Sequence, residues 1–566
     1  MFFDGKQLYV STLVVFVAAA IGALLVFLRG KDAARMRRDA YALGCVCALV
    51  ALASWARFGD FHYTVMDTDP SQVSGSRPKQ AVHQPLHFHE FFHYYLGAKY
   101  FSELGYSGLY DCTTLADAEI AEAEHVGPRI VTRWIRDLDD VLRDNPRDRA
   151  IARCREVQRP RFTDARWAAF SADLRELHRL VPDEWWNDVV YDAGFNPPPS
   201  WVVVGSAVAN VIPIRGAGFR TYLLATSLDM ILLVVCFVSL RRAFGKVTAI
   251  TAVVFFGASF IASYGWNGGA FLRFTWITAV VLALAAMKRG RWALAGALFA
   301  AATCDRLFPV GFAIGAMLPL AATAANRARG AEAASARRIL GRIGFWFAGT
   351  LALLVLVSIG AFGTTPWRVF FARILHHGDI NYTMHIGLKK VLTWRDWVPA
   401  QNFMGHDGLI VFREWNLHLQ RTWVEMRWLA VPIQILGIGA AVLAGARRRA
   451  HESAMLVGAA FMFLFNIPAN YYYAILALVP ALLLRAAATA PTTTRRVREY
   501  ALFTAFVAWW LGTFAASRYS GDVLVYNHLI CVSLAVFLAM WIGGWLATPG
   551  SLRGLKLRRA TARAPG

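Results

Sequence analysis

The segment YLLATSLDMILLVVCFVSL, from Tyr222 to Leu240, is followed directly by the basic run RRAFGK, from Arg241 to Lys246. A helix needs about 20 mostly apolar residues to cross the hydrocarbon core of a bilayer. Lysine and arginine collect in loops on the cytoplasmic side of a membrane. These two neighbouring segments therefore predict a transmembrane helix whose carboxyl end faces the cytoplasm.

The composition of the whole chain agrees with a membrane protein. Of its 566 residues 57% are hydrophobic, the mean hydropathy is +0.41 and the formal net charge is +22. A charge of this size can indicate nucleic-acid binding, but here the arginines and lysines cluster in short loops between apolar segments. Because this is the positive-inside pattern, we expect the lipid bilayer as a partner and no nucleic acid.

The same pattern sets the fold class. The apolar segment from about Leu8 to Leu28 precedes the basic run Arg29 to Arg38, and because no small-residue cleavage site follows it we interpret it as a retained span. A second span covers about Ala42 to Trp55. All of the basic loops can be cytoplasmic only if there are about thirteen spans. We therefore predict an all-α protein, a polytopic transmembrane helix bundle with a large outer-face loop containing amphipathic helices.

Three regions follow from these spans. Residues 1–56 form the N-terminal transmembrane helices, and residues 57–200 form the first large outer loop. Residues 201–566 form a transmembrane bundle with a second outer loop at 363–427 and a basic cytoplasmic tail.

The first outer loop has sequence signals of its own. We expect a charged helical region from Leu115 to Arg149 and an amphipathic helix from Thr163 to Leu180. The prolines from Pro197 to Pro199 cannot lie inside a helix, so they predict the start of the next one. Cys112 and Cys154 share this loop and could pair if it is exported, a question that the sequence leaves open.

The loop also contains the stretch HQPLHFHEFFHYYLGAKYFSELGYSGLYD, from His83 to Asp111, which concentrates ionisable and aromatic residues. We expect an amphipathic helix from His89 to Phe101 that lies in the membrane interface, with Glu90, Tyr94 and Gly97 on one side. A carboxylate there could act as a general base. The alternative is a solvated acidic residue on an interfacial helix.

Basic residues on the outer side are the next informative set. Arg273 and Arg306 lie at the ends of predicted spans, and charges at membrane depth are usually functional. Both could bind an anionic lipid headgroup, because arginine binds phosphate oxygens in a bidentate manner. His385 and Lys389 in the second outer loop could meet the same anion. The alternatives are a local Asp305–Arg306 pair at a helix end and a solvated basic loop.

Taken together, this arrangement resembles the GT-C superfamily of membrane glycosyltransferases, which take a sugar from a polyprenyl-phosphate lipid at the outer face of the membrane. The likeness consists of Glu90 followed by Tyr94 and Tyr95, the segment Gly105 to Asp111, and Asn196 before the prolines. The resemblance implies that Glu90 is the catalytic residue and that the lipid phosphate is bound by basic groups, namely Arg306 with Arg273 and Lys389. It also implies that the substrate site includes His89, His93, Tyr94, Tyr95, Asp111, Asn196 and His385.

Two departures from the family pattern matter. The usual adjacent acidic pair is replaced by His89 and Glu90, and an extra span precedes the catalytic loop. Asp67 and Asp69 are therefore alternative catalytic carboxylates. The resemblance places the protein in the bacterial inner membrane with its active site on the periplasmic side, inverting the anomeric carbon. The acceptor would be a glycan, a lipid or a protein; no bound cofactor is predicted, and whether a divalent cation assists stays open.

A competing class starts from the same residues, because His89 to His93 reads HExxH. On a helix the two histidines lie one turn apart and can bind zinc, and the glutamate can activate a metal-bound water. This pattern predicts a membrane metallopeptidase, with a third ligand to be supplied by His87, Asp111 or His125. A transporter or a non-catalytic scaffold is the third possibility.

Overall fold

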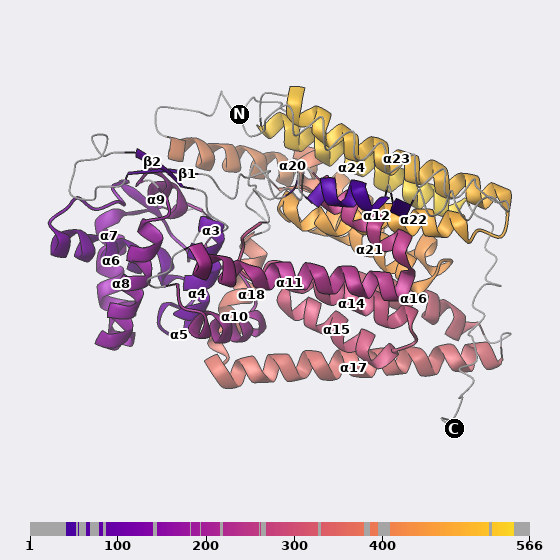
Figure 1. Cartoon of the computed structure of the whole chain (residues 1–566), viewed down its shortest axis with the longest axis horizontal. Coiled ribbons are helices and arrows are strands. Elements are labelled where there is room, and N and C mark those ends of the chain that lie inside the picture. Colours follow the sequence, from indigo (N-terminus) through magenta and orange to yellow (C-terminus); the bar gives the residue numbers. More distant parts are fainter. Residues whose placement is uncertain are drawn as a thin grey trace.

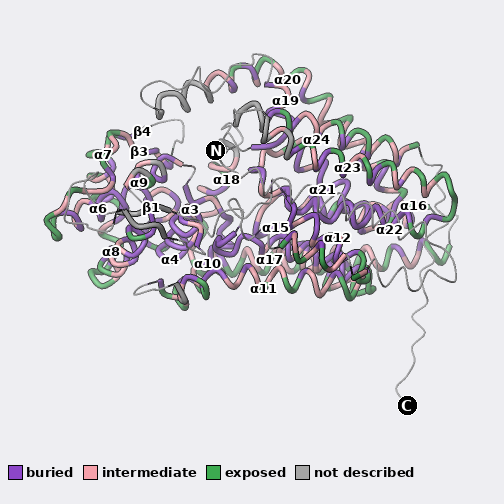
Figure 2. The backbone as a smooth tube through the Cα atoms, turned by 45° about the horizontal axis from the view of Figure 1, so that its top comes forward, coloured by how far each residue is buried: buried purple, intermediate pink, exposed green. Residues whose placement is uncertain are grey.

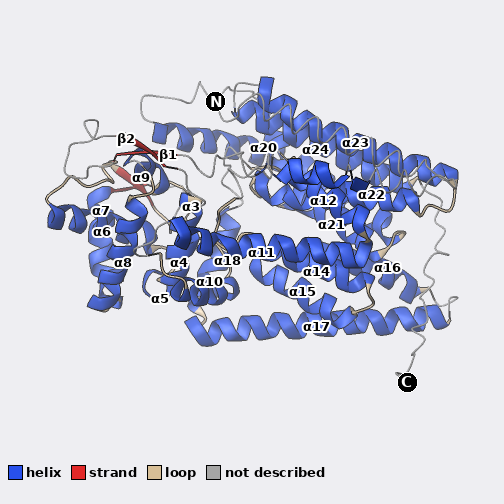
Figure 3. Cartoon of the chain, viewed as in Figure 1, coloured by secondary structure: helices blue, strands red, loops and turns tan. Residues whose placement is uncertain are grey.

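The computed structural model describes residues 41–547 except 43, 53–54, 56–63, 68–78, 83–85, 140–143, 182, 193, 215–218, 260, 262–267, 327–329, 378–384, 394–407 and 520–522. The first predicted span lies outside the described residues. Figure 3 shows helices almost throughout, with strands confined to one end of the molecule. The described part of the chain is therefore mainly α-helical, as predicted.

One end of the molecule is a globular unit of residues 86–214, which we call the loop domain (Figure 1). Its helices are α3 (Phe88–Glu90), η1 (Phe91–Leu96), α4 (Gly97–Lys99), α5 (Phe101–Leu104), α6 (Gly108–Glu124), α7 (Arg147–Arg153), η2 (Cys154–Gln158), η3 (Arg159–Arg161), α8 (Asp164–His178), α9 (Asp183–Val189) and α10 (Pro199–Val211). Large aromatic side chains such as Phe91, Tyr100 and Trp186 are completely buried in its core.

The strands form two short antiparallel hairpins. β1 (Thr64–Asp67) pairs with β2 (Lys79–Val82), and β3 (Trp134–Arg136) pairs with β4 (Asp144–Pro146). The second hairpin falls inside the region that was expected to be helical from Leu115 to Arg149, so that prediction is wrong in its middle part. Its two ends are helical, in α6 and α7.

Helices make up most of the rest of the described chain, and the long ones among them run side by side (Figure 1). They are α11 (Phe219–Phe244), α12 (Lys246–Gly257), α14 (Thr275–Lys288), α15 (Trp292–Asp305), α16 (Val310–Ala325), α17 (Ala331–Phe362), α18 (Thr365–His377), α19 (Leu388–Leu392), α20 (Gly408–Ala446), α21 (Ala450–Phe465), η7 (Asn470–Ala477), α22 (Leu478–Ala488), α23 (Thr493–Tyr519) and α24 (Val523–Leu546). We call them the bundle. α16 packs on α21 at Gly315, where an added Cβ would lie 2.7 Å from the carbonyl oxygen of Ser453.

Five helical segments of the described residues are long and apolar enough to cross a membrane, and they are Thr221–Phe244, Ala331–Phe362, Leu417–Ala446, Asn470–Ala488 and Asn527–Leu546. Six further apolar helices have 10–17 residues. A helix rises about 1.5 Å per residue, so these shorter helices fall below the ~30 Å of a hydrocarbon core. The structure therefore supports a membrane-embedded helical protein, and the number of about thirteen spans stays a prediction.

The outer surface of the bundle is apolar. Along α17 only 6% of the most apolar window is buried, and Phe345, Leu353 and Leu356 are exposed. Figure 2 shows exposed backbone along the outer helices and buried backbone in the interior. An exposed apolar surface of this length suits contact with lipid chains.

Within the loop domain the helical stretch that begins at Phe88 differs from the expected amphipathic helix. It contains a π-helical segment from Phe91 to Leu96 and breaks at Tyr100, where φ is −114° and ψ is 24°. Its side chains are buried on nearly all sides. The stretch is thus a central element of the loop domain, without the exposed polar face that an interfacial helix has.

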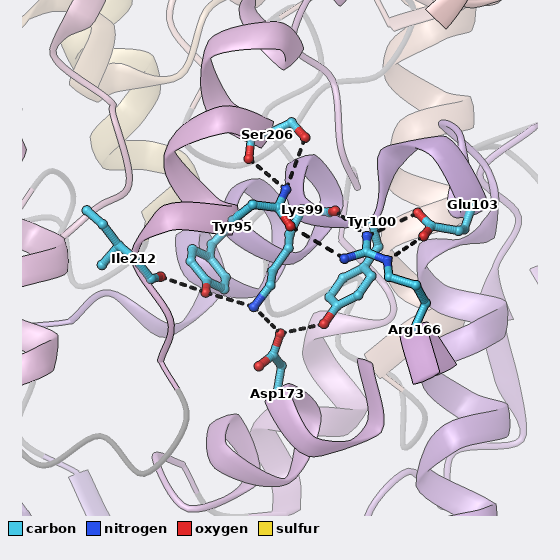
Figure 4. Close-up of polar contacts among 9 residues, drawn as sticks. Tyr95, Lys99, Tyr100, Glu103, Arg166, Asp173, Ser206 and Ile212 are labelled. Carbon is cyan, nitrogen blue, oxygen red and sulfur yellow. Dashed lines mark hydrogen bonds and ion pairs between the residues drawn. The ribbon is translucent and has the colours of Figure 1, made fainter. Parts of the chain in front are cut away.

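Figure 4 shows the polar network that holds this stretch against α8. The Lys99 ammonium donates to the Asp173 carboxylate at 2.6 Å and to the Tyr95 hydroxyl at 3.2 Å. The Tyr100 hydroxyl donates to the same carboxylate at 2.6 Å. Lys99 and Asp173 are both buried, and each neutralises the charge of the other, because an unpaired charge in the core would be costly.

A disulfide joins Cys112 on α6 to Cys154 at the start of η2, with 5.1 Å between the two Cα atoms. Both residues are fully buried. The pairing expected from the sequence is therefore present, and it closes the part of the loop domain that contains the second hairpin.

Candidate functional site

Glu90 lies where the loop domain meets the bundle. The backbone N–H of His87, one residue before α3, donates to the carbonyl oxygen of Gly269 at 2.8 Å. This bond ties the start of the helix to the turn that precedes α14. The Glu90 side chain, 10% exposed, forms an ion pair with the guanidinium of Arg273. The predicted catalytic carboxylate and the predicted phosphate ligand are thus direct partners.

Arg273 is held from two sides. Its backbone N–H and that of Phe274 each donate to the carboxylate of Asp229 at 3.1 Å, so Asp229 fixes the start of α14. Its guanidinium lies 3.9 Å from the ring centroid of Tyr471, within cation–π range. The arginine side chain is only 6% exposed. Its position is therefore set by the bundle, and its charge faces the loop domain.

Arg306 is the second buried cation of the region, with a side chain 11% exposed. Its Nη1 donates to the Asp305 carboxylate at 3.0 Å, and its Nε donates to the hydroxyl of Tyr472 at 3.1 Å. The guanidinium also lies 5.4 Å from the Tyr94 ring and 5.9 Å from the Trp201 ring. The local pair with Asp305 that the sequence suggested is thus present, together with contacts to three distant aromatic rings.

Two tyrosines of η7 connect the two arginines. Tyr471 faces Arg273 and Tyr472 accepts from Arg306, with 4.7 Å between the two ring centroids. Tyr94 is hydrogen-bonded to Tyr472 and so links this pair to the loop domain. We call Glu90, Tyr94, Arg273, Arg306, Tyr471 and Tyr472 the arginine–tyrosine cluster. It gathers residues from four separate parts of the chain.

Gly97 allows a close packing contact within the loop domain. An added Cβ would lie 2.6 Å from the ring of Phe195, so this glycine makes room for a side chain of the loop domain. Tyr94 packs beside it, with its ring centroid 6.0 Å from that of Phe195. Phe195 therefore fills the space beside Gly97.

His89 and His93, the two histidines of the HExxH pattern, contact different side chains of the loop domain. The Nε2 atom of His93 is hydrogen-bonded to the Tyr110 hydroxyl at 2.7 Å, and Nδ1 lies 3.9 Å from the Asp192 carboxylate. Burial lowers the pKa of His93 from 6.5 to about 4, so the ring is neutral. His89 packs against Trp185 with 5.5 Å between ring centroids. Among the described residues no three histidine, cysteine or acidic side chains are grouped to hold a metal.

The hydroxyl of Tyr95 and the carboxylate of Asp111 have partners inside the loop domain. The Tyr95 hydroxyl donates to the carbonyl oxygen of Ile212 at 2.9 Å, which ties α10 to the central stretch. Asp111 is completely buried and forms an ion pair with Arg153. Burial raises the pKa of Asp111 to about 6 despite that partner. In this structure both side chains join elements of the loop domain.

The remaining predicted residues are spread over other places. Asn196 lines a separate cavity beneath α18. His385 forms an isolated bridge with Ala469, just before the tyrosines of η7, and the Lys389 ammonium lies 5.7 Å from the Trp423 ring. His385 therefore lies beside the start of η7, the element that carries Tyr471 and Tyr472. Lys389 is buried beside α20.

The two alternative carboxylates are not placed at the cluster. Asp67 ends β1, opposite Lys79 of β2. Asp69 lies outside the described residues.

Sequence reasoning missed Tyr471, Tyr472 and Asp229. The three consecutive tyrosines from Tyr471 to Tyr473 were a visible signal, because polar aromatics in a short turn between apolar helices often bind a partner. Asp229 was also visible as a carboxylate inside an apolar span. No match to this chain was found among protein-family models, curated proteins or solved structures.

Proposed function

We propose that this protein is a membrane glycosyltransferase that moves a sugar from a polyprenyl-phosphate donor to an acceptor hydroxyl at the outer face of the membrane. The observation that supports this best is the arginine–tyrosine cluster. It combines a carboxylate with two buried guanidinium groups where the loop domain meets the apolar bundle. A lipid-linked anion needs cations at this kind of boundary, and sugar transfer needs a base.

The ion pair between Glu90 and Arg273 implies that the donor binds before Glu90 accepts a proton. Both arginines already have a carboxylate partner, Glu90 for Arg273 and Asp305 for Arg306. The donor phosphate is a diester that carries one negative charge, as a carboxylate does, and its two free oxygens can bind the planar guanidinium side by side. A bound donor would therefore compete with Glu90 for Arg273, and a Glu90 carboxylate released in this way can accept a proton.

The chemical step then follows at the anomeric carbon. Glu90 takes the proton from the acceptor hydroxyl, whose oxygen forms a bond to the anomeric carbon as the bond from that carbon to the phosphate oxygen breaks. The electron pair of the broken bond stays on the phosphate, which Arg273 and Arg306 stabilise. Attack opposite the leaving group inverts the configuration. The rings of Tyr94, Tyr471 and Trp201 surround the arginines and offer apolar faces to a sugar.

The disulfide supports an outer position for the loop domain. Structural disulfides persist in oxidising compartments such as the bacterial periplasm and are rare in the cytosol. The bond between Cys112 and Cys154 lies inside the loop domain, and α6, which carries Cys112, is hydrogen-bonded through Tyr110 to His93 in the helical stretch that follows Glu90. We therefore propose the bacterial inner membrane as the location, with the cluster on the periplasmic side.

A panel of donors tests the activity. Purified full-length protein is incubated with radiolabelled polyprenyl-phosphate sugars and with membrane extract as a source of glycan, lipid and protein acceptors. We expect label from at least one donor to appear in an acceptor, with inverted anomeric configuration. If every donor stays intact while the protein remains folded, the proposal is wrong, and a transporter or scaffold becomes the better hypothesis.

A further inference from the structure

Trp185 of α9 keeps part of a large aromatic ring exposed on the surface of the loop domain. It is 39% exposed, whereas the next residue, Trp186, is completely buried. Its ring is held from two sides, by Phe88 with 6.3 Å between ring centroids and by His89 with 5.5 Å. Because these neighbours fix the ring, it can receive a ligand with little further loss of freedom.

A row of polar side chains connects Trp185 to the arginine–tyrosine cluster. The rings of His89 and His93, one helical turn apart, have 6.4 Å between their centroids. Nδ1 of His93 lies 3.9 Å from the carboxylate of Asp192, whose side chain is 42% exposed. Asp192 is also close enough to Tyr471 for its charge to act on that hydroxyl. We call Trp185, His89 and Asp192 the rim site, because they border the cluster and are partly open to solvent.

The charge of the rim site restricts the ligands that it can take. Asp183, at the start of α9, is balanced by Arg129 at 2.5 Å, but Asp192 brings a carboxylate to the rim site itself. A carboxylate repels phosphate groups and other anions, including the headgroups of anionic lipids. The rim site therefore suits a neutral ligand with hydroxyl groups that a carboxylate can accept.

We propose that the rim site binds a neutral saccharide, and that this saccharide is the acceptor of the transfer reaction. The C–H groups of a sugar ring carry a small positive charge and pack on the electron-rich face of an aromatic ring such as that of Trp185. The Asp192 carboxylate accepts hydrogen bonds from sugar hydroxyls, and the His89 imidazole can donate or accept one more. The role as acceptor rests on the proposed function, whereas the binding of a saccharide does not.

The opposite charges of the rim site and the cluster would keep the two substrates apart. The donor phosphate needs the guanidinium groups of Arg273 and Arg306, and Asp192 repels it. A neutral sugar can therefore occupy the rim site while the donor occupies the cluster. Because His89 directly precedes Glu90 in the chain, a saccharide bound there would bring a hydroxyl towards the base. Among glycan, lipid and protein acceptors, this arrangement favours a glycan.

Calorimetric titration of the full-length protein in phosphatidylcholine nanodiscs, without sugar-based detergent and without donor, tests the inference. The probes are the neutral trisaccharides maltotriose, mannotriose, arabinotriose and triacetylchitotriose, with trigalacturonate as an anionic counterpart. We expect at least one neutral probe to bind, and Trp185→Ala and Asp192→Ala each to weaken it about tenfold or more. Asp192→Asn should weaken it less, because the amide keeps one acceptor oxygen. The exposed controls Trp428→Ala on α20 and Asp148→Asn on α7 should stay within about twofold of the wild type.

The outcomes decide the inference separately from the proposed function. Failure of every neutral trisaccharide to bind the wild type would overturn the rim site and leave Trp185 as a residue that contacts the membrane. Tighter binding of trigalacturonate, or unchanged affinity in either folded alanine variant, would overturn it as well. If one alanine variant does not fold, the other decides. Saccharide binding by a protein that transfers no sugar would overturn the transferase and keep the site, whereas transfer without saccharide binding would overturn the site alone.

Discussion

Removing the disulfide should make the loop domain much easier to unfold. Cys112 and Cys154 are 42 residues apart in sequence and both are fully buried. The loss of loop-closure entropy for a ring of this length is worth about 4 kcal/mol at 25 °C in the chain-entropy model. Because each 1.4 kcal/mol is a factor of ten, the unfolded population of the loop domain should rise by up to about a thousandfold.

Native-state proteolysis of the full-length protein measures this effect. When the domain closes faster than the protease cuts, the cleavage rate follows the unfolded population. We expect the double variant Cys112→Ala/Cys154→Ala to be cut in the loop domain at least about a hundredfold faster than the wild type. This value is about tenfold below the upper limit of about a thousandfold, because structure that remains in the unfolded state reduces the entropy that the disulfide removes. Cys45→Ala, which removes an unpaired, partly buried cysteine, serves as the control and should change the rate less than about threefold.

Two results would refute this reasoning. One is a cleavage rate of the double variant within about threefold of the wild type, which would mean that the crosslink does not stabilise the domain. The other is alkylation of all seven cysteines in the denatured, unreduced protein, because a disulfide protects two of them.

Three further predictions concern the site and its surroundings. Arg306→Ala should weaken donor binding about tenfold or more, measured with radiolabelled donor on the folded protein, because a charged hydrogen bond to phosphate is lost; unchanged affinity would make Arg306 purely structural. Protein purified without chelator should contain far less than one zinc per chain by elemental analysis, since His93 is engaged with Tyr110, whereas stoichiometric zinc that disappears in both His89→Ala and His93→Ala would favour the metallopeptidase. His93→Gln should lose less stability to denaturant than the wild type as the pH falls from about 6.5 to about 4, because the unfolded wild-type chain protonates His93 over this range while the buried ring stays neutral. Asp111, whose pKa is raised to about 6, contributes the opposite dependence in both proteins, so equal pH profiles of the two would contradict the prediction.

Secondary structure could be predicted where local signals dominate. The helix expected from Thr163 to Leu180 is α8, and it starts where the Thr163 hydroxyl accepts from the N–H of Arg166 at 3.2 Å. The prolines also mark the start of α10 correctly, since Pro199 is its first residue. Capping and proline geometry act within a few residues, so the sequence alone reveals them.

Tertiary contacts explain the main error in the loop domain. α6 ends at His125, which has a left-handed backbone with φ of 55°. The Asp117 carboxylate then accepts from the N–H groups of Arg129 and Ile130 at 3.3 and 2.9 Å and folds the chain back. The sequence does not reveal this chain reversal, because a solvated helix and a loop that folds back have similarly charged compositions.

The site was predictable only in part for a similar reason. Glu90, Arg273 and Arg306 could be singled out because charges are conspicuous in an apolar chain. Tyr472 could not be connected to Arg306, because the two residues are 166 positions apart. The aromatic side chains around Glu90 were expected at a membrane interface, but they form a buried core, and both environments select the same residue types.

The central claim is that Glu90 acts as the base, and the rate of sugar transfer by Glu90→Gln tests it most directly. With saturating donor, we expect the rate to fall by a factor of about 10² to 10⁴, because the amide cannot accept the proton of the acceptor hydroxyl. Donor affinity should stay equal or increase, because Arg273 no longer has Glu90 as a partner. Glu122→Gln, an exposed residue of α6, should transfer at the wild-type rate. Transfer by folded Glu90→Gln within about threefold of the wild type would contradict the account.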